Sequence, residues 1–116
     1  MNSPIETHRN FKEILDRLES FSRSEKIPVE ILEEITADGS SLPIVKLELK
    51  SLSDTPKKVL ISGGIHGDEP AGVETICEFM ENKLYKPHLH HWQITILPCL
   101  NPSGYQRDSR NNYEDK

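Results

Sequence analysis

The sequence contains no apolar run near the roughly 18 residues that a membrane-spanning helix needs, and so gives no reason to expect a membrane partner. Its opening stretch, "MNSPIETHRN", lacks both the basic region and the apolar stretch of a secretory signal peptide. Only two cysteines are present, Cys77 and Cys99, and each lies inside an apolar segment rather than in a disulfide framework. We therefore expect a cytoplasmic protein whose two thiols are reduced, buried and structural.

Basic residues are fewer than acidic ones. The 116 residues include 14 Lys and Arg against 19 Asp and Glu, which gives a formal net charge of −5. The tract "RDSRNN" is basic, but the nearby acids Asp108, Glu114 and Asp115 dilute its field. A chain with this balance argues against nucleic acid or an anionic membrane surface as the partner.

Two segments show the apolar spacing of an amphipathic helix, the first over residues 4–21 and the second over residues 71–84. Pro70 suits the first turn of the second helix, and Asp68 or Glu69 lies near the position of a cap. We expect the apolar face of this second helix to be buried. That face consists of Val73, Ile76, Cys77, Met80 and Leu84.

The remaining apolar segments predict strands. Residues 29–49 predict a β-hairpin around the turn "TADGSSLP". Candidates for its buried face are Ile44 or Val45, Leu47 and Leu49. The runs at 59–62 and 93–100 do not alternate, which predicts adjacent central strands buried on both faces. Residues 101–116 are polar throughout, and we expect a loop there.

This order of elements predicts an α/β fold with a mixed sheet and flanking helices. Two helices would cover the faces of such a sheet only thinly. We therefore expect residues 1–116 to be the N-terminal portion of a single larger domain.

One glycine-rich stretch, "ISGGIHGDEPAG", follows a predicted strand and places His66 and Glu69 three positions apart. Imidazole nitrogen and carboxylate oxygen are both zinc ligands, and open α/β sheets bind ligands at the carboxyl ends of their strands. The tight backbone path would be allowed by Gly63, Gly64 and Gly67. Spacing alone leaves two interpretations open: a metal site, or a loop histidine beside a glutamate that stabilises the next helix through its dipole.

The other chemistry-bearing residues have plainer explanations. The histidines of "PHLHHW" have no cysteine or acid at a telling spacing, so we expect ordinary surface residues at His88, His90 and His91. Trp92, which follows them, is expected to pack rather than to bind a ligand. The stretch "GGIHG" lacks the Lys-Ser/Thr pair and the glycine spacing of a phosphate-binding loop.

Two segments, "GGIHGDEPAG" and the later "LPCLNPSGYQRDSRNN", together resemble the zinc metallocarboxypeptidases of the A/B and D types. They are also similar to the related succinylglutamate desuccinylases and aspartoacylases. The resemblance implies zinc as the cofactor, with His66 and Glu69 as its first two protein ligands. It also implies that Arg110 stabilises the oxyanion, with Arg107 as the alternative. The segment "NPSG" matches the family's second motif, with serine where carboxypeptidases usually have aspartate.

The same resemblance implies a carboxypeptidase-like fold of the phosphorylase/hydrolase kind and hydrolysis of a C-terminal peptide bond. The glycine of "NPSG" favours this peptidase branch, because carboxypeptidases usually keep it. The substrate would be a peptide or an acyl-amino acid with a free carboxylate.

Parts of the family's machinery have no counterpart before Lys116: a third zinc ligand, a catalytic glutamate and a pair that binds the substrate carboxylate. We therefore expect residues 1–116 alone to be inactive, and to self-associate through exposed apolar surface. Two alternatives stay open. One is an amidohydrolase of the desuccinylase/aspartoacylase type acting on a small acyl-amino acid, and the other is a non-catalytic binding module with the same fold.

Overall fold

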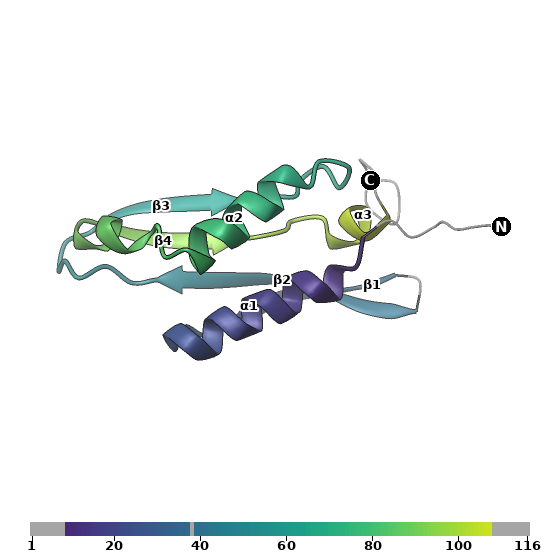
Figure 1. Cartoon of the computed structure of the whole chain (residues 1–116), viewed down its shortest axis with the longest axis horizontal. Coiled ribbons are helices and arrows are strands. Elements are labelled where there is room, and N and C mark those ends of the chain that lie inside the picture. The colour runs from purple at the N-terminus through teal and green to yellow at the C-terminus, as the bar shows by residue number, and fades with distance from the viewer. Residues whose placement is uncertain (1–8, 38, 108–116) are drawn as a thin grey trace.

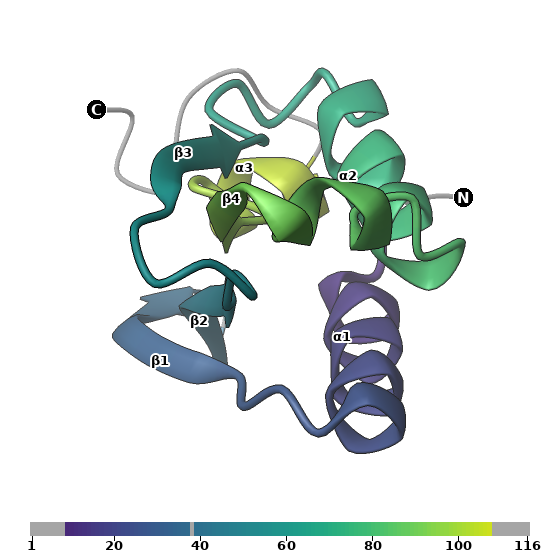
Figure 2. The same cartoon turned by 90° about the vertical axis from the view of Figure 1, so that its left-hand side faces the viewer.

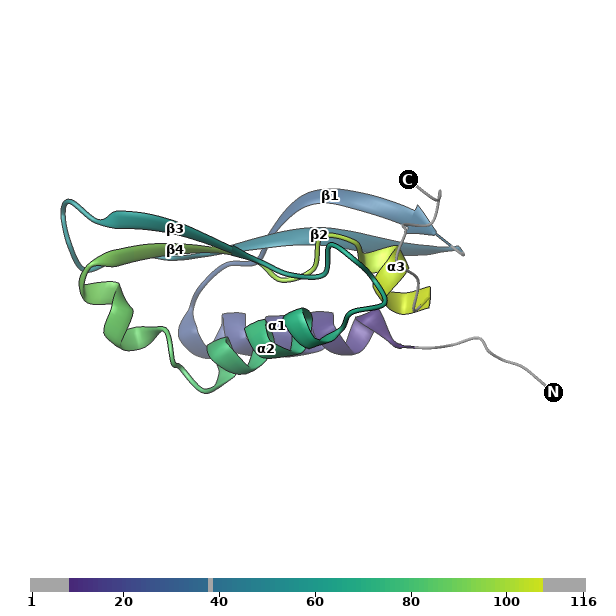
Figure 3. The same ribbon diagram turned by 90° about the horizontal axis from the view of Figure 1, so that it is seen from above.

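Four strands form one mixed sheet, and the two longer helices lie together on one of its faces (Figure 1, Figure 3). The computed structural model describes residues 9–37 and 39–107. Along the chain the elements are α1 (Phe11–Glu25), β1 (Glu30–Ala37), β2 (Ser40–Leu49), β3 (Lys57–Ser62), α2 (Ala71–Glu81), the 3-10 helix η1 (Lys86–His90), β4 (Trp92–Leu97) and α3 (Pro102–Arg107). The predicted α/β class and the mixed sheet are both confirmed.

The strand order is β1-β2-β4-β3, so β4 pairs on both sides. Strands β1 and β2 form the predicted antiparallel hairpin, and β2 also runs antiparallel to β4. Strands β3 and β4 are parallel neighbours, with Ile61 opposite Ile96. Their carboxyl ends therefore meet at one edge of the sheet, which is where the glycine-rich stretch begins.

Local hydrogen bonds set both ends of α1. The Asn10 side chain accepts a hydrogen bond from the backbone N–H of Lys12 at 3.0 Å and so caps the first turn. The helix ends at Glu25, because Lys26 takes a left-handed φ of 59°. The range predicted from the sequence stopped too early, at Phe21, and its expected start lies outside the described residues.

The core lies between the sheet and the two helices, which sit side by side (Figure 2). Strand β2 contributes Val45, Leu47 and Leu49, which confirms the predicted hairpin face. Helix α1 contributes Phe11, Ile14, Leu18 and Phe21, and α2 contributes Val73, Ile76, Cys77 and Met80. Burial of these apolar side chains is the main force that holds the helices on the sheet.

Leu84 does not belong to this core, contrary to the sequence prediction. Helix α2 ends at Glu81, and Lys83 takes a left-handed φ of 57°. The backbone N–H of Leu84 then donates to the Phe79 carbonyl at 3.0 Å, which is the pattern of a Schellman cap. The chain has left the helix before Leu84, whose side chain is 55% exposed.

Strand β3 is the second correction. It lies at the edge of the sheet rather than at its centre, and within the described ranges no strand pairs with its outer side. The two longer helices lie on one face of the sheet (Figure 3), and no described helix covers the other face of β3. Val59 is 36% exposed and Leu60 is 60% exposed. The prediction of a strand here is confirmed, and that of burial on both faces is wrong.

The third correction is α3, in a stretch predicted to be a loop. Pro102 opens this short helix, and the Asn101 side-chain oxygen accepts a hydrogen bond from the Gly104 N–H at 3.1 Å. Tyr105 is buried, with its ring edge-on to Phe11 at 6.1 Å between centroids. A cap and one buried aromatic residue thus order a segment whose composition is polar. Among the described helices, none is long and apolar enough to cross a membrane.

Ion pairs join α1 to α2. Arg17 donates two hydrogen bonds to the Glu81 carboxylate, at 2.8 Å and 2.7 Å, and a third to Glu74. The bond to Arg17 holds the pKa of the Glu81 carboxyl below its usual range. A lowered pKa stabilises the fold above the ordinary carboxyl pKa of about 4.3, and this contribution is lost as the pH falls through the lowered value.

We therefore expect Glu81→Gln to lower the free energy of unfolding by up to about 1 kcal/mol at neutral pH, since the pair is partly exposed. The difference from the unmutated protein should shrink as the pH falls below the carboxyl range. Urea unfolding at neutral and acidic pH measures both quantities, and Glu78→Gln, an exposed glutamate of the same helix, is the control. A Glu81→Gln loss that did not change with pH would contradict the assigned pair.

Candidate metal site

The two sequence segments that predicted the site lie next to each other in the structure. The loop after β3 and the segment after β4 are joined by backbone hydrogen bonds, from Gly63 N–H to the Leu97 carbonyl at 3.1 Å and from Leu100 N–H to the Gly63 carbonyl at 2.9 Å. The Asn101 side chain also donates to the Ile65 carbonyl at 3.4 Å. The parallel pairing of β3 with β4 therefore places "GGIHGDEPAG" beside "NPSG" at one edge of the sheet.

Two glycines make this close approach possible. Gly64 is buried with a left-handed φ of 70°, and a Cβ there would lie 2.8 Å from the Cys99 Sγ and 3.0 Å from the Cys99 Cα. A Cβ on Gly63 would lie 2.9 Å from the Ile76 side chain. The tight path predicted for this stretch is confirmed at both positions, because a larger residue would clash with Cys99 at Gly64 and with α2 at Gly63.

His66 and Glu69 occupy the two ends of one turn in this loop. The Glu69 backbone N–H donates to the His66 carbonyl at 3.1 Å, which closes the turn. His66 is half-buried and Glu69 is exposed. The turn thus brings His66 and Glu69 into one short loop after the carboxyl end of β3; their role as metal ligands stays a prediction.

This pair fits a zinc site as part of its ligand set. A catalytic zinc ion is held by three protein groups and keeps a further position for water or substrate. Histidine nitrogen and glutamate oxygen are a known combination in such sites. In the part of the chain that the structure describes, no group of three histidine, cysteine, aspartate or glutamate side chains is placed to hold an ion. His66 and Glu69 would therefore be two of the three protein ligands.

Arg9 contacts the loop from the start of the chain. Its guanidinium donates to the Gly67 carbonyl, between the two candidate ligands, and through Nε to the Tyr105 carbonyl at 2.9 Å. The guanidinium carbon also lies 4.7 Å from the centre of the Tyr105 ring. Sequence reasoning did not identify this residue, because Gly67 is 58 positions away and Tyr105 is 96 positions away.

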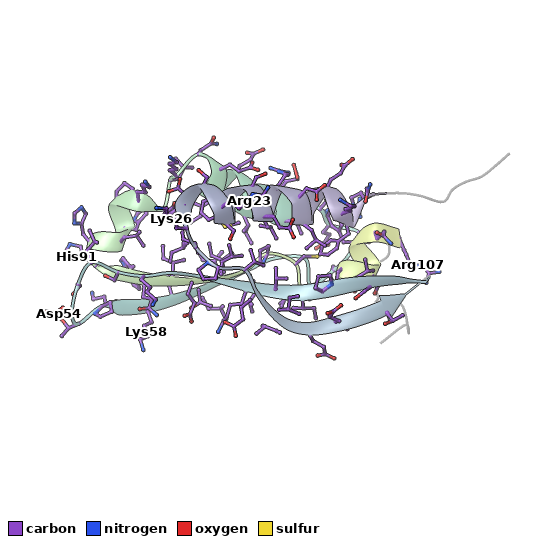
Figure 4. The ribbon with its side chains drawn as sticks, turned by 90° about the horizontal axis from the view of Figure 1, so that it is seen from below. Arg23, Lys26, Asp54, Lys58, His91 and Arg107 are labelled. Atoms are coloured by element: carbon purple, nitrogen blue, oxygen red, sulfur yellow. The ribbon has the colours of Figure 1, made fainter. Side chains whose placement is uncertain are left out.

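The two arginines predicted for the oxyanion lie at and beyond the end of α3. Arg107 is exposed in the last turn of that helix, and Figure 4 labels it at one end of the molecule. Arg110 lies outside the described residues. The choice between them therefore stays a prediction.

The remaining candidates lie outside the His66–Glu69 turn. His88, His90 and His91 are exposed, and Figure 4 shows His91 at the opposite end of the molecule from Arg107. Cys77 and Cys99 are buried, and burial raises their thiol pKa values to about 11 and about 12. Both cysteines are thus poor thiolate nucleophiles at neutral pH, as predicted.

A shallow apolar cavity of about 230 Å³ lies over the middle of β3 and β4 rather than at the glycine-rich loop. It is lined by Val59, Ile61, Phe79, His88, Trp92 and Ile94. Trp92 therefore lines a surface depression, although it also packs partly against the core.

Comparison with solved structures shows the fold. The chain is similar to a candidate metallopeptidase from Shewanella amazonensis SB2B, at 21% identity with a TM-score of 0.74, covering 97% of this chain and 44% of that one. A metallo-carboxypeptidase from Burkholderia cenocepacia matches at 16% identity with a TM-score of 0.75, covering 93% of this chain and 31% of that one. Bovine thrombin-activatable fibrinolysis inhibitor, in complex with tick carboxypeptidase inhibitor, matches at 22% identity with a TM-score of 0.64, covering 92% of this chain and 37% of that one. The chain thus spans less than half the length of these structures, and the predicted carboxypeptidase-like fold is confirmed.

Sequence comparison identifies the family. A search of curated proteins finds no match. Residues 55–115, more than half of the 116-residue chain, match the family described as "Succinylglutamate desuccinylase/Aspartoacylase catalytic domain". The matched region contains the His66–Glu69 turn, the "NPSG" segment and both candidate arginines. On this match and on the fold, the chain belongs to the succinylglutamate desuccinylase/aspartoacylase catalytic-domain family.

Proposed function

We propose that the protein is a zinc-dependent amidohydrolase in which His66 and Glu69 bind the metal. The observation that supports this proposal is the glycine-dependent turn from His66 to Glu69, which follows β3 at the edge where the parallel strands β3 and β4 end. Family membership supports it, because the matched region is a catalytic domain. The third ligand and the general base would come from outside the described residues.

Three residues of the chain have distinct roles in this scheme. His66 would bind zinc through a neutral ring nitrogen, and Glu69 through an ionised carboxylate oxygen. A zinc ion bound there supplies a Lewis acid that activates water and polarises a carbonyl. Arg110 would donate hydrogen bonds to the oxygen on which negative charge develops during amide hydrolysis.

Family membership favours a small acyl-amino acid with a free carboxylate as the substrate. Cleavage of a C-terminal peptide bond is the second candidate. The glycine of "NPSG", Gly104, favours it; this residue is buried in α3 and its N–H donates to the Asn101 side-chain oxygen. Assays of the full-length protein with N-acetylaspartate, N-succinylglutamate and a peptide with a free C-terminus separate these alternatives. Turnover of none of these substrates by the zinc-loaded protein would favour a binding module without activity.

Arg110→Ala should lower kcat by roughly 100- to 1,000-fold, which is the usual cost of losing an oxyanion donor. Arg107→Ala should leave kcat within a few-fold of the unmutated protein. Steady-state kinetics of the two variants measures the contrast, with zinc content checked in each. The reverse pattern, a large loss only in Arg107→Ala, would assign the role to Arg107 instead.

A further inference from the structure

Arg9 connects three separate parts of the chain at the edge that carries the candidate ligands. It precedes α1, and its own backbone N–H donates to the Gln106 carbonyl in α3 at 3.2 Å. Figure 1 shows α3 beside the start of α1. The Arg9 side chain then reaches the carbonyls of Gly67 and Tyr105. One residue thus joins the start of α1, the glycine-rich loop and α3.

The contact with Gly67 lies at the point where the loop most needs support. Gly67 is the residue directly after His66, inside the turn that ends at Glu69, and it is buried. Glycine has more backbone conformations open to it than other residues, so a glycine-rich turn does not fix its own geometry. A hydrogen bond to the Gly67 carbonyl removes that freedom between the two candidate ligands.

The shape of the guanidinium group suits it to this task. Its nitrogens are held in one plane, so Nε and Nη2 can bind two carbonyls at a fixed separation. Here Nε binds Tyr105 and Nη2 binds Gly67. A lysine has the same charge but only a single flexible ammonium group, and it cannot hold both carbonyls in one fixed arrangement.

The charge of Arg9 and its hydrogen bonds to the loop would change metal affinity in opposite directions. A guanidinium close to a bound cation repels it, so removing the charge of Arg9 would strengthen metal binding if electrostatics decided the outcome. If Arg9 acts by fixing the turn, its removal weakens metal binding instead. The sign of the change therefore separates the two roles.

We propose that Arg9 is a positioning residue of the metal site, which fixes the His66–Glu69 turn through the Gly67 carbonyl and ties it to α3. The proposal rests on the proposed role of His66 and Glu69 as zinc ligands. Outer-shell groups that orient metal ligands typically contribute 10- to 100-fold to metal affinity. Arg9 would contribute to metal affinity by a similar factor, through its hydrogen bond to the Gly67 backbone carbonyl.

The test compares Arg9→Met and Arg9→Lys with the control variants Arg23→Met and Arg23→Lys in the full-length protein. Arg23 is exposed in the last turn of α1 (Figure 4). Zinc affinity is measured by calorimetric titration, and backbone hydrogen exchange of residues 63–69 is measured in the metal-free protein. We expect both Arg9 variants to bind zinc about 10- to 100-fold more weakly and to exchange faster within 63–69. Both Arg23 variants should be unchanged.

Unchanged or tighter zinc binding in both Arg9 variants would overturn the proposal. Faster exchange throughout the chain, with zinc affinity preserved, would show a general structural role and would overturn it too. Arg9→Lys keeps the charge and most of the aliphatic stem, so it tests the paired hydrogen bonds of the guanidinium even if Arg9→Met fails to fold. A His66→Ala variant in the same titration identifies failure of the metal site itself, since zinc affinity would then survive that change. In that case, hydrogen exchange of residues 63–69 in the metal-free Arg9 variants would still show whether Arg9 fixes the turn, because loss of that contact should speed exchange there.

Discussion

Gly64→Ala should lower the free energy of unfolding by about 2–5 kcal/mol, the sum of two separate costs. A non-glycine residue with a left-handed φ costs roughly 1–2 kcal/mol, and overpacking at a filled site typically adds about 1–3 kcal/mol. Both apply, because Gly64 has a φ of 70° and a Cβ there would lie 3.0 Å from the backbone of Cys99. Urea unfolding of the variant measures the loss.

Gly39 provides a matched control. Its φ of 76° is nearly the same, but a Cβ there would meet no atom within 4 Å. Gly39→Ala should therefore show only the backbone cost, about 1–2 kcal/mol. Equal losses in the two variants would contradict the close packing of the loop against Cys99.

The second large effect concerns the ligands themselves. In the full-length protein, His66→Ala and Glu69→Ala should each weaken zinc binding by more than the 10- to 100-fold typical for loss of an outer-shell partner. Because zinc binds the neutral imidazole and the ionised carboxylate, protons compete with the ion, and affinity should also fall on acidification. Calorimetric titration over a range of pH measures both effects.

The exposed histidines of η1 supply the control for this experiment. His88→Ala and His90→Ala remove imidazoles that lie outside the glycine-rich loop, and zinc affinity should not change. Unchanged affinity in both His66→Ala and Glu69→Ala would mean that the motif forms a turn without a metal.

Short-range patterns predicted the two longer helices, the four strands and most of the buried residues. Helical spacing identified Val73, Ile76 and Met80 as the inner face of α2, and alternation identified Leu47 and Leu49 in β2. Both helix ends were misjudged, because they depend on lysines at left-handed positions, Lys26 and Lys83. Lysine has no preference for that conformation, so composition gives no signal there.

Features that depend on distant residues were not predictable from local patterns. The run at 59–62 is apolar enough for a central strand, but among the described strands it pairs only with β4 and so lies at the edge of the sheet. Helix α3 is polar in composition and is ordered by Asn101, Phe11 and Arg9. The Arg9 contact spans most of the chain, and only the three-dimensional structure brings it to the loop.

Diffraction from zinc-soaked crystals of the full-length protein, recorded at the zinc absorption edge, tests most directly whether His66 and Glu69 share one ion. The anomalous signal locates the metal without any assumption about its ligands. We expect a single strong peak about 2 Å from a ring nitrogen of His66 and about 2 Å from a carboxylate oxygen of Glu69. A peak beside His88, His90 or His91, with none at the turn, would contradict the assignment of the metal site.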